Sequence, residues 1–75
     1  MLEKVKSVLV DALNIDENTI TPTSNLKDNL SIDSLSAVEL ALELESEFDI
    51  RIDDEELANL VTVQDITDLV SRKES

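Results

Sequence analysis

Apolar residues near the start of the chain recur at steps of three and four positions, the spacing of one face of an α-helix. This spacing predicts a first helix over residues 2–13, and its apolar face should contribute to a core. The residues of that face are Leu2, Val5, Val8, Leu9, Ala12 and Leu13.

The periodicity is lost between residues 14 and 33. Pro22 and the polar residues around it disfavour a helix, because proline lacks a backbone N–H and short polar side chains favour turns. Apolar residues that would anchor this segment recur within it, namely Ile20, Leu26, Leu30 and Ile32. We therefore predict a long, anchored loop, and loops of this length in compact domains are often functional.

A second helix is predicted from Ser34 to about Glu47. Asp33 precedes it and suits the N-cap position, because its carboxylate can accept hydrogen bonds from free N–H groups of the first turn. The apolar residues of this helix spread over more than one face. We expect Ala37, Ala41 and Leu44 to point inward, and Leu35, Val38 and Leu42 to be partly exposed beside Ser34.

Two more helix starts carry a capping signal, a polar residue followed three positions later by an acidic one. Asp53 with Glu56 opens a short helix through Leu57 and Leu60, and Thr62 with Asp65 opens a last helix. The last helix should bury Val63, Ile66, Leu69 and Val70 and should end near Arg72 and Lys73, whose charges suit a helix C-terminus. The pattern predicts an all-α fold, a small four-helix bundle with a short third helix, a long loop between helices one and two, and no strand.

Composition narrows the class of protein. The 75 residues are predicted to form one domain, residues 1–75, with a core of Leu, Ile and Val, because Phe48 is the sole aromatic residue. The net charge of −12 disfavours binding to nucleic acid or anionic membranes and favours basic surfaces on partner proteins. The chain has no cysteine and no long apolar stretch, so nothing calls for an oxidising compartment or membrane insertion. We expect a cytoplasmic monomer.

Ser34 is the strongest candidate for chemistry. The chain has no His and no Cys, and no Lys lies within several residues of Ser34 to take its proton. A serine without a base suits an acceptor role better than nucleophilic catalysis. A phosphate ester at a helix start is favoured by unpaired N–H groups and by the positive end of the helix dipole. The position therefore suits a phosphodiester-linked group, and no catalytic residue or metal ligand is predicted.

Acidic residues concentrate between residues 33 and 56, a segment that we call the acidic stretch. Arg51 is the single basic residue of this segment. Its acidic residues are Asp33, Glu39, Glu43, Glu45, Glu47, Asp49, Asp53, Asp54, Glu55 and Glu56. Most charge runs are solvated helix faces. This run begins beside Ser34 and surrounds apolar residues, so a partner-docking surface is the alternative interpretation.

A family resemblance follows from these residues. Asp33-Ser34-Leu35, followed by Val38-Glu39-Leu40 and Leu44-Glu45-Ser46-Glu47-Phe48, resembles the acyl carrier proteins of dissociated bacterial fatty-acid synthesis, over nearly the whole chain. The resemblance implies that Ser34 carries 4′-phosphopantetheine, installed from coenzyme A by a magnesium-dependent phosphopantetheinyl transferase. It also implies that the chain is no enzyme: growing acyl chains would ride as thioesters on the arm and be presented to fatty-acid synthesis enzymes with basic docking surfaces.

The resemblance assigns roles to further residues. Asp33 belongs to the attachment motif. Partner docking is implied for Leu35, Val38, Glu39, Leu42, Glu45 and Asp54, and an acyl-chain cleft for Leu26, Ala37, Leu44, Ile52, Leu57 and Leu60. A core of Leu, Ile and Val with few aromatics agrees with such a cleft, because it could part between helices and shelter a hydrocarbon chain.

Two residues depart from the family pattern. Ser31 stands two positions before the motif aspartate, where family members usually have Gly, and serine tolerates a positive φ poorly. Ser36 stands two positions after the motif serine, where family members often have an acid, so one docking charge is missing.

On the residues alone, an interaction module and specialised carriers stay open as alternative functions, whereas calcium binding and hydrolysis are disfavoured. An acidic helical protein-interaction module would use the same acidic stretch with Ser34 unmodified. A calcium-binding EF-hand loop would need a turn glycine, and the chain has no Gly. A hydrolase using Ser34 would lack its base. Among carriers, a specialised polyketide or aminoacyl pathway stays open, because specificity lies largely in the enzymes that dock.

Overall fold

The computed structural model describes residues 2–74, and Met1 and Ser75 lie outside the described residues. Its α-helices are α1 (Leu2–Leu13), α2 (Ser34–Phe48), α3 (Asp54–Ala58) and α4 (Val63–Glu74). Residues 2–74 contain no strand, although Asn25 and Thr62 form an isolated antiparallel bridge. The predicted all-α fold is confirmed, including the short third helix and the long loop between α1 and α2.

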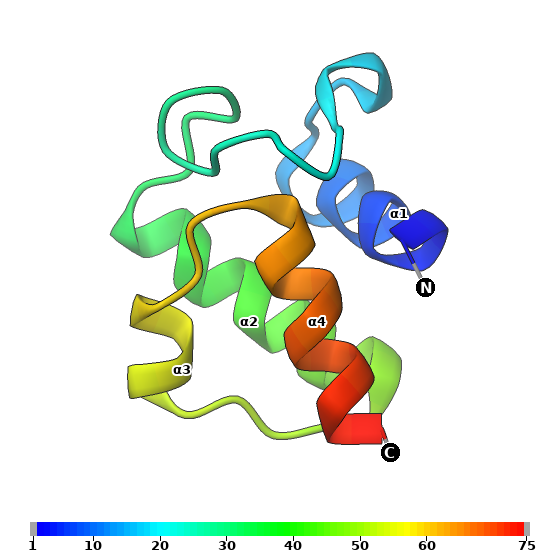
Figure 1. Cartoon of the computed structure of the whole chain (residues 1–75), viewed down its shortest axis with the longest axis vertical. Coiled ribbons are helices and arrows are strands. Elements are labelled where there is room, and N and C mark those ends of the chain that lie inside the picture. The colour runs from blue at the N-terminus through cyan, green and yellow to red at the C-terminus, as the bar shows by residue number, and fades with distance from the viewer. Residues whose placement is uncertain (1, 75) are drawn as a thin grey trace.

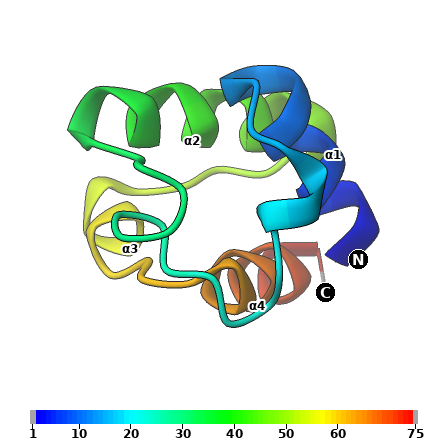
Figure 2. The same ribbon diagram turned by 90° about the horizontal axis from the view of Figure 1, so that it is seen from above.

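The arrangement of the helices brings three segments together at one corner. α1 packs against both α2 and α4, and α3 contacts α2. α1 and α3 lie on opposite sides of the molecule in both views, and the α1–α2 loop crosses one end of the bundle (Figures 1 and 2). The start of α2 lies on the same side as α3 (Figures 1 and 2), and residues of the loop, of α2 and of α3 line one pocket.

The core is aliphatic. Its fully buried side chains come from α1, α2 and α4, and the largest are Val5, Leu9, Leu40, Leu44, Val63, Ile66, Leu69 and Val70. All four residues of α4 that were predicted to point inward are buried. In α2, Ala41 and Leu44 are buried as predicted and Ala37 is half-buried. Leu40, for which the apolar pattern predicted no face, is only 1% exposed.

The α1–α2 loop is anchored as predicted. Its four apolar residues, Ile20, Leu26, Leu30 and Ile32, are all buried. Backbone hydrogen bonds also fix it to the start of α4: Leu26 N–H donates to the Val61 carbonyl at 2.9 Å and Gln64 N–H donates to the Pro22 carbonyl at 2.9 Å. The loop also contains a short 3₁₀ helix, Glu17–Thr19, that the sequence analysis did not predict.

One helix end differs from the sequence prediction. α2 ends at Phe48, in agreement with the predicted end at about Glu47, and Asp49 after it adopts a left-handed conformation with φ of 53°. α3 is shorter than expected and ends at Ala58, so Leu60 lies in the connection to α4 instead of in the helix.

Candidate functional site

Ser34 is the first residue of α2 and is exposed. The carboxylate of Asp33 accepts a hydrogen bond from Ser36 N–H at 2.9 Å, so the predicted N-cap is confirmed. The backbone N–H of Ser36 beside it is the main reason that the pKa of the Asp33 carboxyl lies below its ordinary value. The cap therefore stays ionised and holds the helix start in place while leaving Ser34 accessible.

The turn before the cap has an unusual backbone. Ser31 has a φ of 56°, in the left-handed region where a Cβ atom is unfavourable. Ile32 N–H donates to the carbonyl of Leu26 at 2.8 Å, which ties this turn back to the loop. The positive φ explains why glycine suits the position, and here serine occupies it.

A pocket of about 340 Å³ opens beside Ser34, and we call it the Ser34 pocket. The loop and α2 form one side, and α3 with its connection to α4 forms the other. Its lining residues are Leu26, Lys27, Ile32, Asp33, Ser34, Ala37, Val38, Leu40, Asp54, Leu57, Ala58 and Leu60. Most of these residues are apolar, so an apolar surface lies directly beside the serine.

Four of the six residues predicted to lie around an acyl cleft line this pocket, namely Leu26, Ala37, Leu57 and Leu60. Leu44 and Ile52 do not line it. Leu44 is 0% exposed within the core, and Ile52 is half-buried in the α2–α3 connection. The pocket lining also includes residues that were not predicted for the cleft, among them Lys27, Ile32, Leu40 and Ala58. The four-residue step from Leu40 to Leu44 could have identified Leu40, whereas no local pattern marks Lys27.

The predicted exposure of three α2 side chains is confirmed. Leu35, Val38 and Leu42 are 69%, 48% and 60% exposed. Their spacing of three and four positions places them on one helix face, beside Ser34 and the exposed Glu39. These three side chains form an exposed apolar stripe on the surface of α2.

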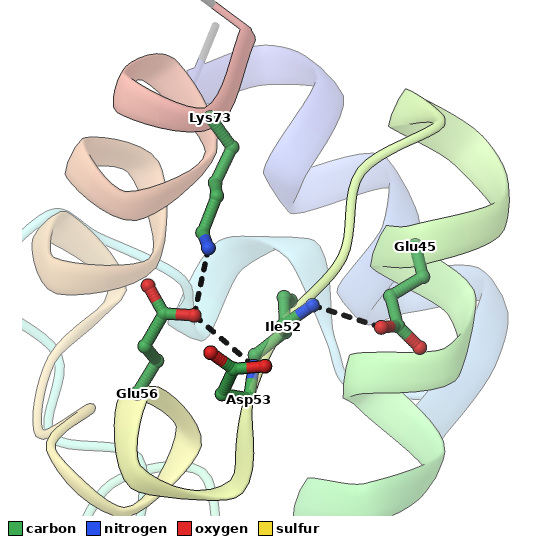
Figure 3. Close-up of polar contacts among 5 residues, drawn as sticks. All are labelled: Glu45, Ile52, Asp53, Glu56 and Lys73. Atoms are coloured by element: carbon green, nitrogen blue, oxygen red, sulfur yellow. Dashed lines mark hydrogen bonds and ion pairs between the residues drawn. The ribbon is translucent and has the colours of Figure 1, made fainter.

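Polar contacts hold the α2–α3 connection and α3 (Figure 3). Glu45 was predicted to be a docking residue. One oxygen of its carboxylate accepts a hydrogen bond from Ile52 N–H at 2.8 Å, within the chain itself. The Glu56 carboxylate accepts from Asp53 N–H at 3.1 Å and pairs with Lys73 Nζ at 2.8 Å. The Lys73 hydrogen bond is the main reason that the pKa of Glu56 lies below its ordinary value. No residue of α3 is buried, so this helix contributes no fully buried side chain to the core.

Residues 2–74 contain no cluster of three or more acidic side chains placed to hold a metal ion. Within the same range, every helix is too short or too polar to cross a membrane.

The fold and site define an α-helical domain that presents one serine at a helix start, beside an apolar pocket. Residues 3–70 match the family described as the phosphopantetheine attachment site. The chain is 42% identical over 73 residues to the acyl carrier protein of Thermosynechococcus vestitus, covering 97% of this chain and 90% of that protein. The acyl carrier protein of Petrotoga mobilis is also 42% identical over 73 residues, covering 97% of this chain and 86% of that protein.

A solved structure supports the same assignment. The acyl carrier protein of Thermotoga maritima matches with a TM-score of 0.83 at 29% identity, covering 96% of this chain and 84% of that one. The chain therefore belongs to the acyl carrier protein family, whose members carry phosphopantetheine and are carriers rather than catalysts. The resemblance identified from the sequence is confirmed.

Proposed function

We propose that this chain carries growing acyl chains as thioesters on a 4′-phosphopantetheine arm attached to Ser34, and presents them to fatty-acid synthesis enzymes. The observation that carries the proposal is the exposed Ser34 at the start of α2, beside an apolar pocket, in a chain that matches the phosphopantetheine attachment family. The chain has no cysteine, so the arm supplies the thiol that a thioester needs.

The residues around Ser34 fit such an attachment. The side chain is exposed, and the start of α2 favours an anion through its dipole. In the attachment reaction, a bond forms between Ser34 Oγ and the phosphorus that bears pantetheine in coenzyme A. The bond from that phosphorus to the 3′,5′-ADP part breaks, and the serine proton goes to a base of the transferase. The catalytic groups for this step come from the transferase, in keeping with the lack of His and Cys here.

The Ser34 pocket supports a sheltering role for the chain. Leu57 and Leu60 line it from the α3 side, and Leu26 and Ala37 line it from the loop and α2. Burial of hydrocarbon is worth about 0.8 kcal/mol per methylene, less the cost of opening the pocket further. A carried acyl chain could therefore lie between α2 and α3 until a partner withdraws it.

The docking surface that we propose is the exposed face of α2. Leu35, Val38 and Leu42 supply apolar contacts, and Glu39 supplies charge that basic partner surfaces would attract. Asp54, the first residue of α3, also lines the Ser34 pocket and adds a negative charge on the α3 side. We propose the phosphopantetheinyl transferase and the fatty-acid synthesis enzymes as partners, with the monomer acting in the cytoplasm.

Intact-protein mass tests the attachment site. The unmodified chain is incubated with coenzyme A, magnesium and a broad-specificity phosphopantetheinyl transferase, alongside Ser34→Ala and Ser36→Ala. We expect one phosphopantetheine on the parent and on Ser36→Ala, and none on Ser34→Ala. Ser36→Ala is the matched control, because Ser36 lies in the same helical turn. No gain by a folded parent with more than one transferase would favour the interaction module.

Thermal unfolding tests the shelter. Forms carrying butyryl, hexanoyl and octanoyl thioesters are compared with the form bearing the free thiol. We expect the melting temperature to rise with acyl length until the chain outgrows the pocket, because each buried methylene adds stability to the folded state. Equal melting temperatures for all three acyl forms would exclude sheltering while leaving the attachment at Ser34 intact.

A further inference from the structure

We propose that Lys27 is a positioning residue for the arm, and that its ammonium group pairs with the phosphodiester on Ser34 and holds the start of the arm at the rim of the Ser34 pocket. The proposal rests on the proposed attachment at Ser34. It concerns a residue that no local sequence pattern connects with the motif.

The fold brings Lys27 and Ser34 to the same place. Both line the Ser34 pocket, although they are separated along the chain by the rest of the loop. Ile32 N–H donates a hydrogen bond to the Leu26 carbonyl at 2.8 Å. This hydrogen bond holds the backbone next to Lys27 close to the backbone that leads into Ser34. Lys27 N–H donates to Asn25 Oδ1 at 2.9 Å, which fixes the backbone from which the lysine extends.

The lysine is available for a ligand. Lys27 is exposed, and it is the single basic residue between Lys6 and Arg51. Over residues 2–74 the one ion pair joins Lys73 to Glu56, so no carboxylate of these described residues pairs with the Lys27 ammonium.

The charges at the pocket give Lys27 its role. Asp33 and Asp54 also line the pocket, and Lys27 is the one basic residue in that lining. A phosphodiester on Ser34 adds a negative charge beside these two carboxylates, and their repulsion alone would push the arm toward solvent. A lysine ammonium is an effective point-charge partner for phosphate. Lys27 therefore offsets the repulsion on the loop side and keeps the arm over the apolar lining.

NMR of the phosphopantetheine-bearing protein tests the pairing in the parent, Lys27→Gln, Lys27→Arg and Lys4→Gln. The parent should show contacts between the Lys27 Hε protons and the arm methylene next to the phosphate. The ³¹P shift of Lys27→Gln should differ from that of the parent, whereas Lys4→Gln should keep the parental shift and Lys27→Arg should stay closer to the parent than Lys27→Gln does. Lys4→Gln is the matched control, since it removes the same charge from exposed α1 surface.

Salt gives a second readout. In 1 M NaCl the Debye length is about 3 Å, so the ³¹P difference between the parent and Lys27→Gln should become smaller. A parent that carries one phosphopantetheine by mass, but shows no lysine contact and the same ³¹P shift as Lys27→Gln, would overturn the role of Lys27 and leave the attachment standing. A folded parent that gains no mass with the transferases would overturn the proposed function itself.

Discussion

α3 and α4 begin with similar capping residues but are stabilised in different ways. Glu56 accepts from Asp53 N–H at the start of α3, and Asp65 accepts from Thr62 N–H at the start of α4. α4 then buries Val63, Ile66, Leu69 and Val70, whereas α3 buries none of its five residues. The same local signal thus opens one helix that is part of the core and one that lies on its surface.

The difference bears on the Ser34 pocket. A five-residue helix is too short to be stable by itself, so α3 depends on its neighbours. Those neighbours hold it through the Lys73–Glu56 pair and through the half-buried Leu57. Because α3 forms one side of the pocket, we expect this side to yield to an acyl chain at a lower free-energy cost than the side formed by α2.

The largest expected effect comes from truncating the core of α4. Ile66→Ala should lower the free energy of unfolding by about 3 kcal/mol, because Ile66 is 0% exposed and its removal leaves a cavity. A core of this size supplies only a few kcal/mol in total, so the variant should be largely unfolded at 37 °C. Urea unfolding followed by circular dichroism measures the loss. The exposed control Gln64→Ala should change the free energy of unfolding little. A loss for Ile66→Ala no larger than that for Gln64→Ala would contradict the conclusion that α4 is part of the core.

A smaller effect is expected at the cap of α4. Asp65 accepts from Val61 N–H and Thr62 N–H at 3.0 Å each, so Asp65→Ala should cost about 1 kcal/mol near neutral pH. The Thr62 N–H is the main reason that the pKa of Asp65 lies below its ordinary value of 3.8. Because the pKa of Asp65 is lower in the folded state, the contribution of its ionised carboxylate to folding stability is fully present above pH 3.8. This contribution is lost as the pH falls through the pKa of the folded state.

The pH dependence separates the cap from a general charge effect. The stability difference between the parent and Asp65→Ala should narrow as the pH falls below 3.8. Asp68→Ala removes an equal charge from the same helix and serves as the control. A gap between the parent and Asp65→Ala that stays constant down to pH 2 would exclude the ionised cap as its source.

A smaller change in global stability is expected for Leu57→Ala. Leu57 is half-buried on α3, so truncation should lower the free energy of unfolding by less than about 1 kcal/mol. Amide hydrogen exchange should nevertheless quicken across Asp54–Ala58 and stay unchanged in α4, because α3 opens locally. A loss as large as that of Ile66→Ala would show that α3 is part of the same cooperative core.

The smallest effect is expected at the ion pair of α3. Lys73→Gln removes the partner of Glu56 and should lower the melting temperature slightly at low salt. A double-mutant cycle with Glu56→Gln measures the coupling between the two side chains, which should vanish in 1 M NaCl. Coupling that persists at high salt would mean that the pair is less accessible to ions than its partial exposure indicates.

Local patterns in the sequence determined most of the fold. Helix periodicity placed α1 and α4, and Asp33 and Asp65 marked helix starts that the structure confirms. These features are predictable because helix hydrogen bonds and caps join residues within four positions of each other. The same locality made Ser34 a candidate acceptor, since its exposure follows from its place at the start of a helix.

Tertiary packing decided what surrounds Ser34. The structure brings Lys27 to the pocket, excludes Leu44 from its lining and engages Glu45 with the α2–α3 connection. It also decided that α3 would lie on the surface, although its capping residues resemble those of α4. These outcomes depend on how the α1–α2 loop and the helices pack, through contacts between residues far apart in the chain. No repeating pattern or local hydrogen bond in the sequence encodes such contacts, so only the folded structure could establish them.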